Sequence, residues 1–180
     1  MSCANKEVQN DHFEEFFTLE LDKHGYQALY KRKTNEVYSG NPLTMDGCAT
    51  FFRRDRFSHV KKYEVEFNKA AQSLTDFAIP STQKKAALNR LVKDNVALIV
   101  VLEAKFTNQG VDNPGKRQLL CVANTIVNVQ QDLKDVKIWQ VLISISLEKI
   151  AASADIPMLV CGDFNSVPGR YVHNVTLHGY

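Results

Sequence analysis

An uninterrupted apolar run, VALIVVL at residues 96–102, is the feature that most constrains how this chain folds. A strand with one face in water alternates apolar and polar residues, so a run without polar positions must be covered on both faces. The run is also far shorter than the roughly 20 residues that a membrane-spanning helix needs. QLLCVANT at residues 118–125 and MLVCG at residues 158–162 are similar, so we expect buried strands there too.

A long helix is expected between the last two of these strands. DLKDVKIWQVLISISLEKIAAS at residues 132–153 repeats apolar residues at helical spacing, and Pro157 ends the pattern. Strands buried on both faces and joined by a long helix indicate an α/β protein whose helices lie outside its sheets. Further strands are predicted at YQALY, DGCATFF and YEVEFN, the last with alternating apolar and acidic side chains.

The N-terminal part is predicted to begin almost directly on a helix. DHFEEFFTLELDKHG at residues 11–25 places Phe13, Phe17 and Leu21 at helical spacing. Asp11 is placed to cap this helix at its start, and Gly25 is placed to end it. In contrast, residues 70–95 show no sustained pattern, so we expect irregular chain there with one helical turn near residues 83–88.

The composition is that of an ordinary globular domain. A chain of 180 residues with 44% hydrophobic and 23% charged residues can bury one core of its own. The net charge of +2 does not by itself indicate a polyanionic partner, and basic pairs such as Lys84-Lys85 are expected to be solvated unless a site lies nearby. Four cysteines without C-x-x-C spacing and an N-terminus without an apolar signal segment predict a soluble, intracellular protein.

The strand MLVCG breaks into Asp163, Phe164 and Asn165. In an extended strand, residues two apart point to the same side, so Asp163 and Asn165 are expected to project together from its carboxyl end. A carboxylate there can hold a hard cation or deprotonate an attacking water, and the carboxamide can donate to a phosphate oxygen. Gly162 would let a ligand approach the backbone closely. The alternative is that Asp163 only caps a turn in which Asn165 is left-handed.

Two other strand ends carry the same kinds of side chain. Asn124 ends the CVAN strand, and Asp94 and Asn95 directly precede the 96–102 run. Each of these alone is typical of turns or strand starts. Their presence on separate strands, together with Asp163 and Asn165, favours metal-assisted phosphoester hydrolysis, because that chemistry needs convergent oxygen and amide groups.

These residues carry a recognisable pattern. Four stretches closely resemble the endonuclease/exonuclease/phosphatase superfamily. They are MLVCGDFNSVP, LLCVANT, NRLVKDNVALIVVLE and above all DGCATFFRRDRFSHVKKYEVEFN. Within it they resemble the carbon catabolite repressor type of poly(A) deadenylase in its plant form. The resemblance implies an incomplete four-layer α/β sandwich with two facing mixed β-sheets and helices outside. It implies Mg²⁺-dependent 3′-to-5′ removal of adenylates from messenger RNA tails, with release of AMP.

The resemblance also implies roles for particular residues. KEVQN is similar to the family's L-Q-E-V-Q, which makes Glu7 the expected Mg²⁺ ligand. Asp163 would be the general base or a metal-linked carboxylate, and Asn165 and Asn124 would bind the scissile phosphate. Asp94 and Asn95 match the family's K-D-N and would line the substrate site. The implied partners are single-stranded poly(A) RNA and subunits of a deadenylase complex, with no membrane, in the nucleus and the cytoplasm.

The chain departs from the family pattern at several points. Only six residues precede Glu7, so the strand that begins the family's domain is expected to be missing, as are its C-terminal strands with an Asp-His pair. The family's N-T-H is N-T-I here, with Ile126 in place of the histidine, and His173 matches a different turn. Residues 1–180 are therefore predicted to form a single, partial domain. Because members of a catalytic set act together, we expect little or no deadenylase activity from this chain alone.

Two other functions remain open from the sequence. One is a catalytically inactive fragment or decoy, which binds RNA or deadenylase-complex partners without cleaving; Ile126 favours it, while Asp163, Asn165 and Glu7 favour the enzyme. The other is a phosphoesterase of the same superfamily that acts on sugar or inositol phosphates. The DGCATFF stretch argues against this last function.

Overall fold

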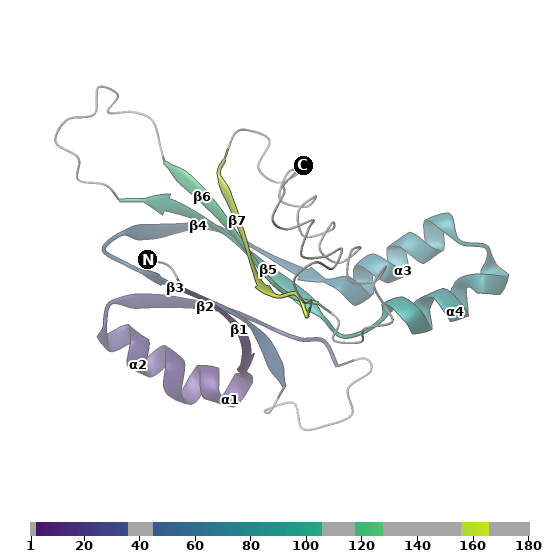
Figure 1. Ribbon diagram of the computed structural model, residues 1–180, viewed down its shortest axis with the longest axis horizontal. Helices are drawn as coiled ribbons and strands as arrows, with labels where there is room; N and C mark the ends of the chain where they lie inside the picture. The colour runs from purple at the N-terminus through teal and green to yellow at the C-terminus, as the bar shows by residue number, and fades with distance from the viewer. Residues whose placement is uncertain (1–2, 36–44, 106–117, 128–155, 166–180) are drawn as a thin grey trace.

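The computed structural model describes residues 3–35, 45–105, 118–127 and 156–165, which form two β-sheets with helices around them (Figure 1). One sheet has the order β1-β3-β2 and the other the order β4-β5-β6-β7. The strands are β1 (Cys3–Gln9), β2 (Tyr26–Arg32), β3 (Asp46–Arg53), β4 (Phe57–Glu66), β5 (Val96–Ala104), β6 (Leu119–Ile126) and β7 (Met158–Asp163). The predicted strands are thus present, and the predicted α/β class with two sheets is confirmed.

The uninterrupted apolar run forms β5, which lies inside the four-stranded sheet. It pairs antiparallel with β4 and β6, and β6 pairs in parallel with β7, so this sheet is mixed. One face of β5 packs toward the other sheet, where Phe52 of β3 meets Leu98, Val100 and Ile126 in a buried cluster. The opposite face carries a second buried cluster that includes Ile99 and Phe67. Both faces of β5 are therefore covered, as its sequence predicted.

Residues 10–23 form one continuous helical segment against the outer face of the β1-β3-β2 sheet (Figure 1). It consists of α1 (Asn10–His12), the π-helical turn η1 (Phe13–Phe17) and α2 (Thr18–Lys23). Phe13 stacks on Tyr30 with ring centroids 4.4 Å apart, which fixes the segment to the sheet. Gly25, with φ of 77°, ends the segment as predicted.

Two expectations for the N-terminal part are wrong. Gln9, not Asp11, precedes the first helical residue, and Asp11 instead accepts a hydrogen bond from the His12 amide at 2.7 Å. The chain also does not begin on a helix, because β1 pairs with β3 ahead of it. The short, mostly polar sequence of β1 has no apolar alternation, and only pairing with a neighbouring strand makes it extended.

The expectation of irregular chain over residues 70–95 is also wrong. Two helices, α3 (Phe67–Ala78) and α4 (Ser81–Leu91), form a hairpin that projects from the sheets (Figure 1). Pro80 stands directly before the first residue of α4, where a missing N–H costs no helical hydrogen bond. Most of α4 is exposed, and it lacks the apolar periodicity of a helix packed on a core, whereas α3 keeps that periodicity with Phe67, Ala71 and Leu74.

Several predictions fall on residues that the structure does not describe. The helix at residues 132–153, which would supply the fourth layer, lies outside the described residues, as do His173 and the C-terminal segment. The assignment of residues 1–180 to a single partial domain therefore stays a prediction. Within the described parts of the chain, no helix is both long and apolar enough to cross a membrane.

Candidate functional site

The strand ends that carry the predicted site residues lie at one end of the two-sheet body. The end of β6 is beside the end of β7, because Ile126 pairs with Asp163. The start of β5 is on the other side of β6, because Ala97 pairs with Thr125. The β1-β3-β2 sheet reaches the same end through a hydrogen bond from the Thr34 amide to the Asp94 carbonyl at 3.2 Å. The sheets therefore gather segments that are far apart in the sequence.

Asp163 and Asn165 form a tight turn instead of continuing the extended strand. Asn165 has φ of 47°, and its amide donates to Asp163 Oδ1 at 2.9 Å. The Asn165 carboxamide donates to the Val127 carbonyl at 3.0 Å, and the Val127 amide donates to the Asp163 carbonyl at 3.0 Å. The expected projection of both side chains from one extended strand is wrong. The turn nonetheless holds a half-buried carboxylate and a half-buried carboxamide two residues apart.

Gly162 allows the backbone of β7 to lie close to the backbone of β6. Its φ is 137°, and a Cβ atom at this position would collide with the backbone carbonyl of Thr125 on β6. Glycine is therefore required for β7 to lie this close to β6 just before the Asp163 turn. The expectation that Gly162 makes room for a ligand is replaced by this close contact between strands.

Asn124 connects the two sheets. Its side chain is fully buried, and Nδ2 donates to the Ala49 carbonyl of β3 at 2.9 Å. Ala49 pairs with Asn5 of β1 at the point where the β1–β3 register shifts. A buried amide that bridges two sheets contributes to holding the end of the sandwich together, and here it also ties β6 to the part of β1 that contains Glu7.

Glu7 lies in the register shift of β1, between Asn5 and Val8. The backbone there is held from two sides: Asn124 bonds the β3 partner of Asn5, and the Tyr30 hydroxyl donates to the Val8 carbonyl at 2.8 Å. Burial raises the pKa of the Tyr30 phenol, which keeps the hydroxyl protonated as a donor. The Glu7 side chain lies outside what the structure describes, so only the backbone of β1 is placed relative to Asp163.

Asp94 and Asn95 are buried, and Asp94 belongs to a polar network. Asp94 is 6% exposed, with φ of 57°, and its Oδ1 accepts from Thr34 Oγ1 at 2.7 Å and Asn68 Nδ2 at 2.8 Å. This network joins β2, α3 and the start of β5. The Asn95 carbonyl accepts from the Phe67 amide at 3.2 Å. By the β5–β6 register Asn95 lies beside Val127, so it is the nearer of the two to the Asp163 turn.

Ile126 packs into the core. It is 1% exposed and belongs to the buried cluster between the sheets. The sequence pattern expects a phosphate-reaching imidazole at this position, whereas an isoleucine supplies only apolar contact. Position 126 therefore contributes to the stability of the core in this chain.

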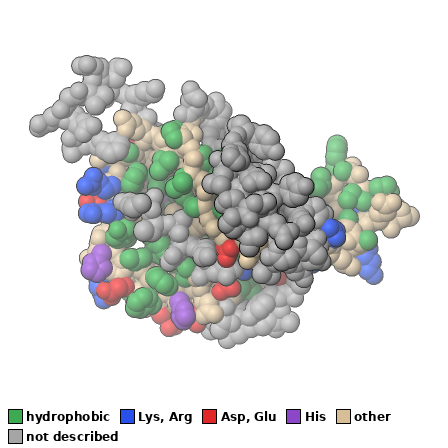
Figure 2. Space-filling model, viewed as in Figure 1, with side chains coloured by type: hydrophobic (Ala, Val, Ile, Leu, Met, Phe, Trp, Pro, Cys, Tyr) green, Lys and Arg blue, Asp and Glu red, His purple; other side chains and the backbone are tan. Residues whose placement is uncertain are grey.

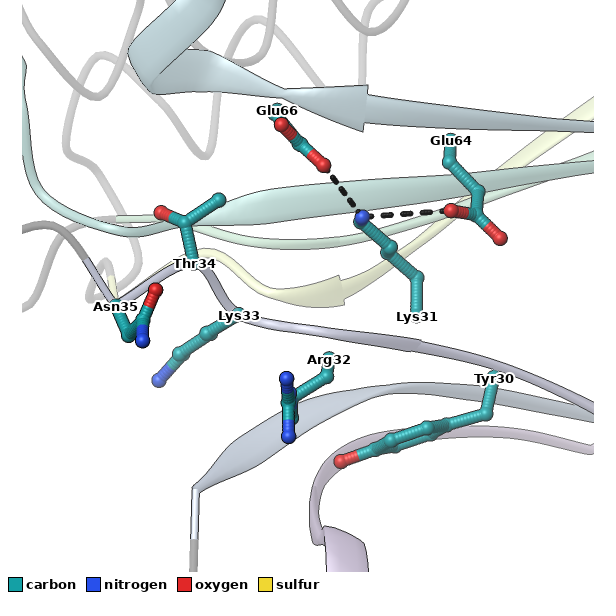
Figure 3. A pocket seen from close by; sticks show the side chains of 8 residues that line it. All are labelled: Tyr30, Lys31, Arg32, Lys33, Thr34, Asn35, Glu64 and Glu66. Carbon is teal, nitrogen blue, oxygen red and sulfur yellow. Dashed lines mark hydrogen bonds and ion pairs between the residues drawn. The ribbon is translucent and has the colours of Figure 1, made fainter. Parts of the chain in front are cut away.

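A polar pocket of about 430 Å³ between the edge strands β2 and β4 was not predicted from the sequence (Figure 3). Lys31 crosses from β2 to Glu66 at 2.6 Å and Glu64 at 3.3 Å, which links the two sheets. The hydrogen bond from Lys31, followed by that from Lys69, lowers the pKa of Glu66. The alternating acids of YEVEFN opposite the basic run KRK were the available signal. Since its acids are paired with lysines, this pocket is an ion-paired seam.

The donor atoms at the strand ends suit a hard cation. They are the carboxylate of Asp163 and the amide oxygen of Asn165, whereas the amide oxygen of Asn124 is buried. Mg²⁺ prefers oxygen ligands, of which one or two carboxylates suffice. Among the described residues no group of three or more His, Cys, Asp or Glu side chains gathers around one point. A site built from one described carboxylate, an amide and waters fits the chemistry of Mg²⁺, and Glu7 would add the second carboxylate.

Comparison with curated proteins gives close relatives. The chain is 77% identical over 175 residues to Carbon catabolite repressor protein 4 homolog 1 of Arabidopsis thaliana, a match that covers 97% of this chain and 29% of that protein. It is 32% identical over 194 residues to CCR4-NOT transcription complex subunit 6-like-B of Xenopus laevis, covering 97% of this chain and 34% of that protein. The chain thus spans about a third of the length of these relatives. No protein-family model matches it.

Solved structures share its fold. ANGEL2, a 2′,3′-cyclic phosphatase crystallised with adenosine-2′,3′-vanadate, is 26% identical with a TM-score of 0.72, over 99% of this chain and 43% of that one. An endonuclease/exonuclease/phosphatase family protein from Bacteroides thetaiotaomicron is 13% identical with a TM-score of 0.55, over 96% of this chain and 53% of that one. The second likeness shows the fold alone.

Proposed function

This chain is a close homologue of the carbon catabolite repressor protein 4 homologs and has the fold of the endonuclease/exonuclease/phosphatase proteins, and on that premise we propose that it acts on poly(A) RNA. The proposed reaction is Mg²⁺-dependent hydrolysis of the last phosphodiester at the 3′ end, with release of AMP. The observation that carries the proposal is the meeting of the β1, β6 and β7 ends, because it brings Asn124 and the Asp163 turn to the strand of Glu7.

In this proposal the Asp163 carboxylate takes a proton from the attacking water. The water oxygen bonds to phosphorus while the bond to the 3′ oxygen of the preceding nucleotide breaks, and that oxygen leaves. Asn165 and Asn124 orient the phosphate, and Glu7 with Asp163 would hold Mg²⁺. A bound Mg²⁺ supplies stabilisation of the negative charge that develops on the phosphate oxygens. The hydrogen bond from the Asn165 amide to Asp163 fixes the carboxylate for its role.

The proposed rate for this chain is low, because Ile126 supplies no imidazole to the substrate. The same observation favours a second candidate function, in which the chain binds poly(A) or a deadenylase-complex partner without cleaving. The name of the Xenopus relative, a CCR4-NOT transcription complex subunit, supports a complex of that kind as the partner. We also propose residence in the nucleus and the cytoplasm, which imaging of a fluorescent fusion tests.

The experiment that tests the proposal is a Mg²⁺ titration of the purified 180-residue chain with 5′-labelled oligo(A). We expect slow, Mg²⁺-dependent shortening from the 3′ end that is lost in Asp163→Ala. Oligo(C) of equal length is the substrate control. If the chain binds oligo(A) but does not shorten it at any Mg²⁺ concentration, the proposed enzyme activity is contradicted and the proposed binding function is supported. Shortening that persists in Asp163→Ala would contradict the proposed site.

A further inference from the structure

The α3–α4 hairpin exposes apolar side chains that a soluble helix normally covers. Phe77, the last residue but one of α3, is 95% exposed, and Leu74 on the same helix is 40% exposed. The start of α3 is buried, as Phe67 and Ala71 are fully covered by the body of the protein. The apolar side of this helix thus continues beyond the body, where an almost fully exposed phenylalanine has no packing role to explain it.

Basic residues lie on the neighbouring helix, α4. Lys84 of α4 forms an ion pair with Asp76, the neighbour of Phe77, at 3.1 Å, which brings the start of α4 next to the end of α3. Lys85 follows and is exposed, and α4 contains Arg90 but no acidic residue. Figure 2 shows green apolar and blue basic side chains together on this projecting hairpin. The hairpin therefore carries an exposed aromatic ring on α3 and exposed basic residues on α4.

The base of the hairpin is fixed next to the candidate site. Asn68 Oδ1 accepts from the amides of Lys93 and Asp94 at 3.0 and 3.1 Å, which closes the two helices on each other. Asn95, the next residue, lies beside Val127, whose carbonyl and amide bond Asn165 and Asp163. An RNA strand that runs from the Asp163 turn past Val127 and Asn95 would thus reach the α3–α4 hairpin.

An exposed aromatic ring beside cations has the chemistry that proteins use for single-stranded nucleic acid, where bases stack on the ring and phosphates meet the charges. An apolar patch of one phenylalanine and one partly covered leucine is small for a stable protein interface. From these observations we propose that the α3–α4 hairpin binds the RNA strand upstream of the 3′ end, with Phe77 stacking on a base and Lys85 contacting a phosphate. The proposal extends the proposed function and rests on it for the identity of the RNA.

The test compares two double variants that are matched in residue type. Phe77→Ala/Lys85→Ala removes the proposed contacts, and Phe16→Ala/Lys23→Ala removes an exposed phenylalanine and a lysine from the helical segment on the far sheet. Both are made in the Asp163→Ala chain, and binding is measured by fluorescence anisotropy with labelled oligo(A) of about 20 and about five nucleotides. Circular dichroism checks that each variant remains folded.

We expect the hairpin variant to bind the longer oligo(A) about tenfold more weakly, as loss of one stacked base predicts. The slope of log affinity against log salt should become shallower by about 0.7, the value for one lost phosphate contact on a single strand. Binding of the short oligo(A) and all binding by the control variant should stay within about twofold. Unchanged affinity of the hairpin variant for the longer RNA, or an equal loss in the control, would overturn the proposal and leave a protein partner for this surface.

The design separates this inference from the proposed function. Because every chain carries Asp163→Ala, the binding result does not depend on cleavage. If the hairpin variant binds RNA more weakly while the wild-type chain never shortens oligo(A), the proposed RNA-binding surface is supported and the proposed nuclease activity is contradicted. Cleavage by the wild-type chain without a hairpin effect does the reverse.

Discussion

Two stretches of this chain place an aspartate and an asparagine close together at one end of a strand or directly before it, and the fold uses them differently. Asp163 and Asn165 follow β7, whereas Asp94 and Asn95 precede β5. Both stretches contain a non-glycine residue with positive φ, which is Asn165 in one and Asp94 in the other. Their sequences alone therefore suggest the same kind of turn and the same kind of chemistry.

The partners of the two carboxylates separate them. Asp94 is buried, and its Oδ1 receives two hydrogen bonds from side chains of other elements, Thr34 and Asn68. Asp163 is half-buried, and its Oδ1 receives an amide hydrogen bond from within its own turn. A carboxylate that joins distant elements contributes mainly to stability, whereas one held by a local turn at a more open edge can serve a ligand. The difference is one of burial and partners.

The largest effect is expected from Asp163→Asn. The substitution keeps the size of the side chain and its acceptor oxygen, but it removes the basicity that activation of water requires. We expect oligo(A) shortening to fall about 10²–10⁴-fold, the usual contribution of a general base. The rate of shortening at saturating Mg²⁺ is the measurement, with the melting temperature as a control. If the variant melts at a much lower temperature than the wild-type chain, Asp163 has a structural role like that of Asp94.

Asp94→Ala should act on stability. It removes the acceptor of the Thr34 hydroxyl and one of the two acceptors of Asn68 Nδ2, and it puts alanine at a left-handed φ of 57°. Together these changes should cost about 2–3 kcal/mol of unfolding free energy. Urea denaturation followed by circular dichroism measures this loss. Asp76→Ala, at an exposed ion pair, is the matched control and should change stability by less than about 0.5 kcal/mol. Equal stabilities for the two variants would break the distinction between the carboxylates.

The turn at Asn165 can be tested by a pair of substitutions. Asn165→Ala and Asn165→Gly both remove the hydrogen bond to the Val127 carbonyl, but only alanine must hold a strained left-handed backbone. We expect the alanine variant to be less stable than the glycine variant by about 1 kcal/mol in urea denaturation. If alanine proves the more stable of the two, the left-handed turn is not the conformation in solution.

The smallest effect is expected at Glu66. Its carboxylate is held by the ammonium groups of Lys31 and Lys69, so it can be compared with the two aspartates, which accept hydrogen bonds. Lys31, then Lys69, lowers its pKa below the value in the unfolded chain. Its contribution to stability is therefore fully present above the unfolded pKa and is lost as the pH falls through the folded pKa. Glu66→Gln should cost a fraction of a kcal/mol, about 0.5, at neutral pH, and the cost should vanish at an acid pH below the folded pKa. Urea denaturation at both pH values measures it, and an equal cost at both would exclude the ion pair as its source.

The sequence predicted the strands well and the exposed helices poorly. Residues 96–102 and MLVCG were both predicted to be buried strands, and both are strands, the first buried and the second half-buried at the edge of its sheet. In the α3–α4 hairpin, α4 was missed because it carries little apolar periodicity, whereas Phe67, Ala71 and Leu74 of α3 did offer that signal. The ion-paired seam around Lys31 was missed because its charges come from two strands in different sheets.

By itself, the sequence determined that buried strands end in carboxylate and carboxamide groups, because apolar runs and the residues after them are local properties of the chain. The tertiary structure alone decided which of these groups became structural. Burial of Asp94 against Asn68 and the bridge from Asn124 to Ala49 depend on segments 26 and 75 residues apart. The physical reason is that the hydrogen-bond partners and exposure of a polar group depend on chain packing, which no local pattern contains.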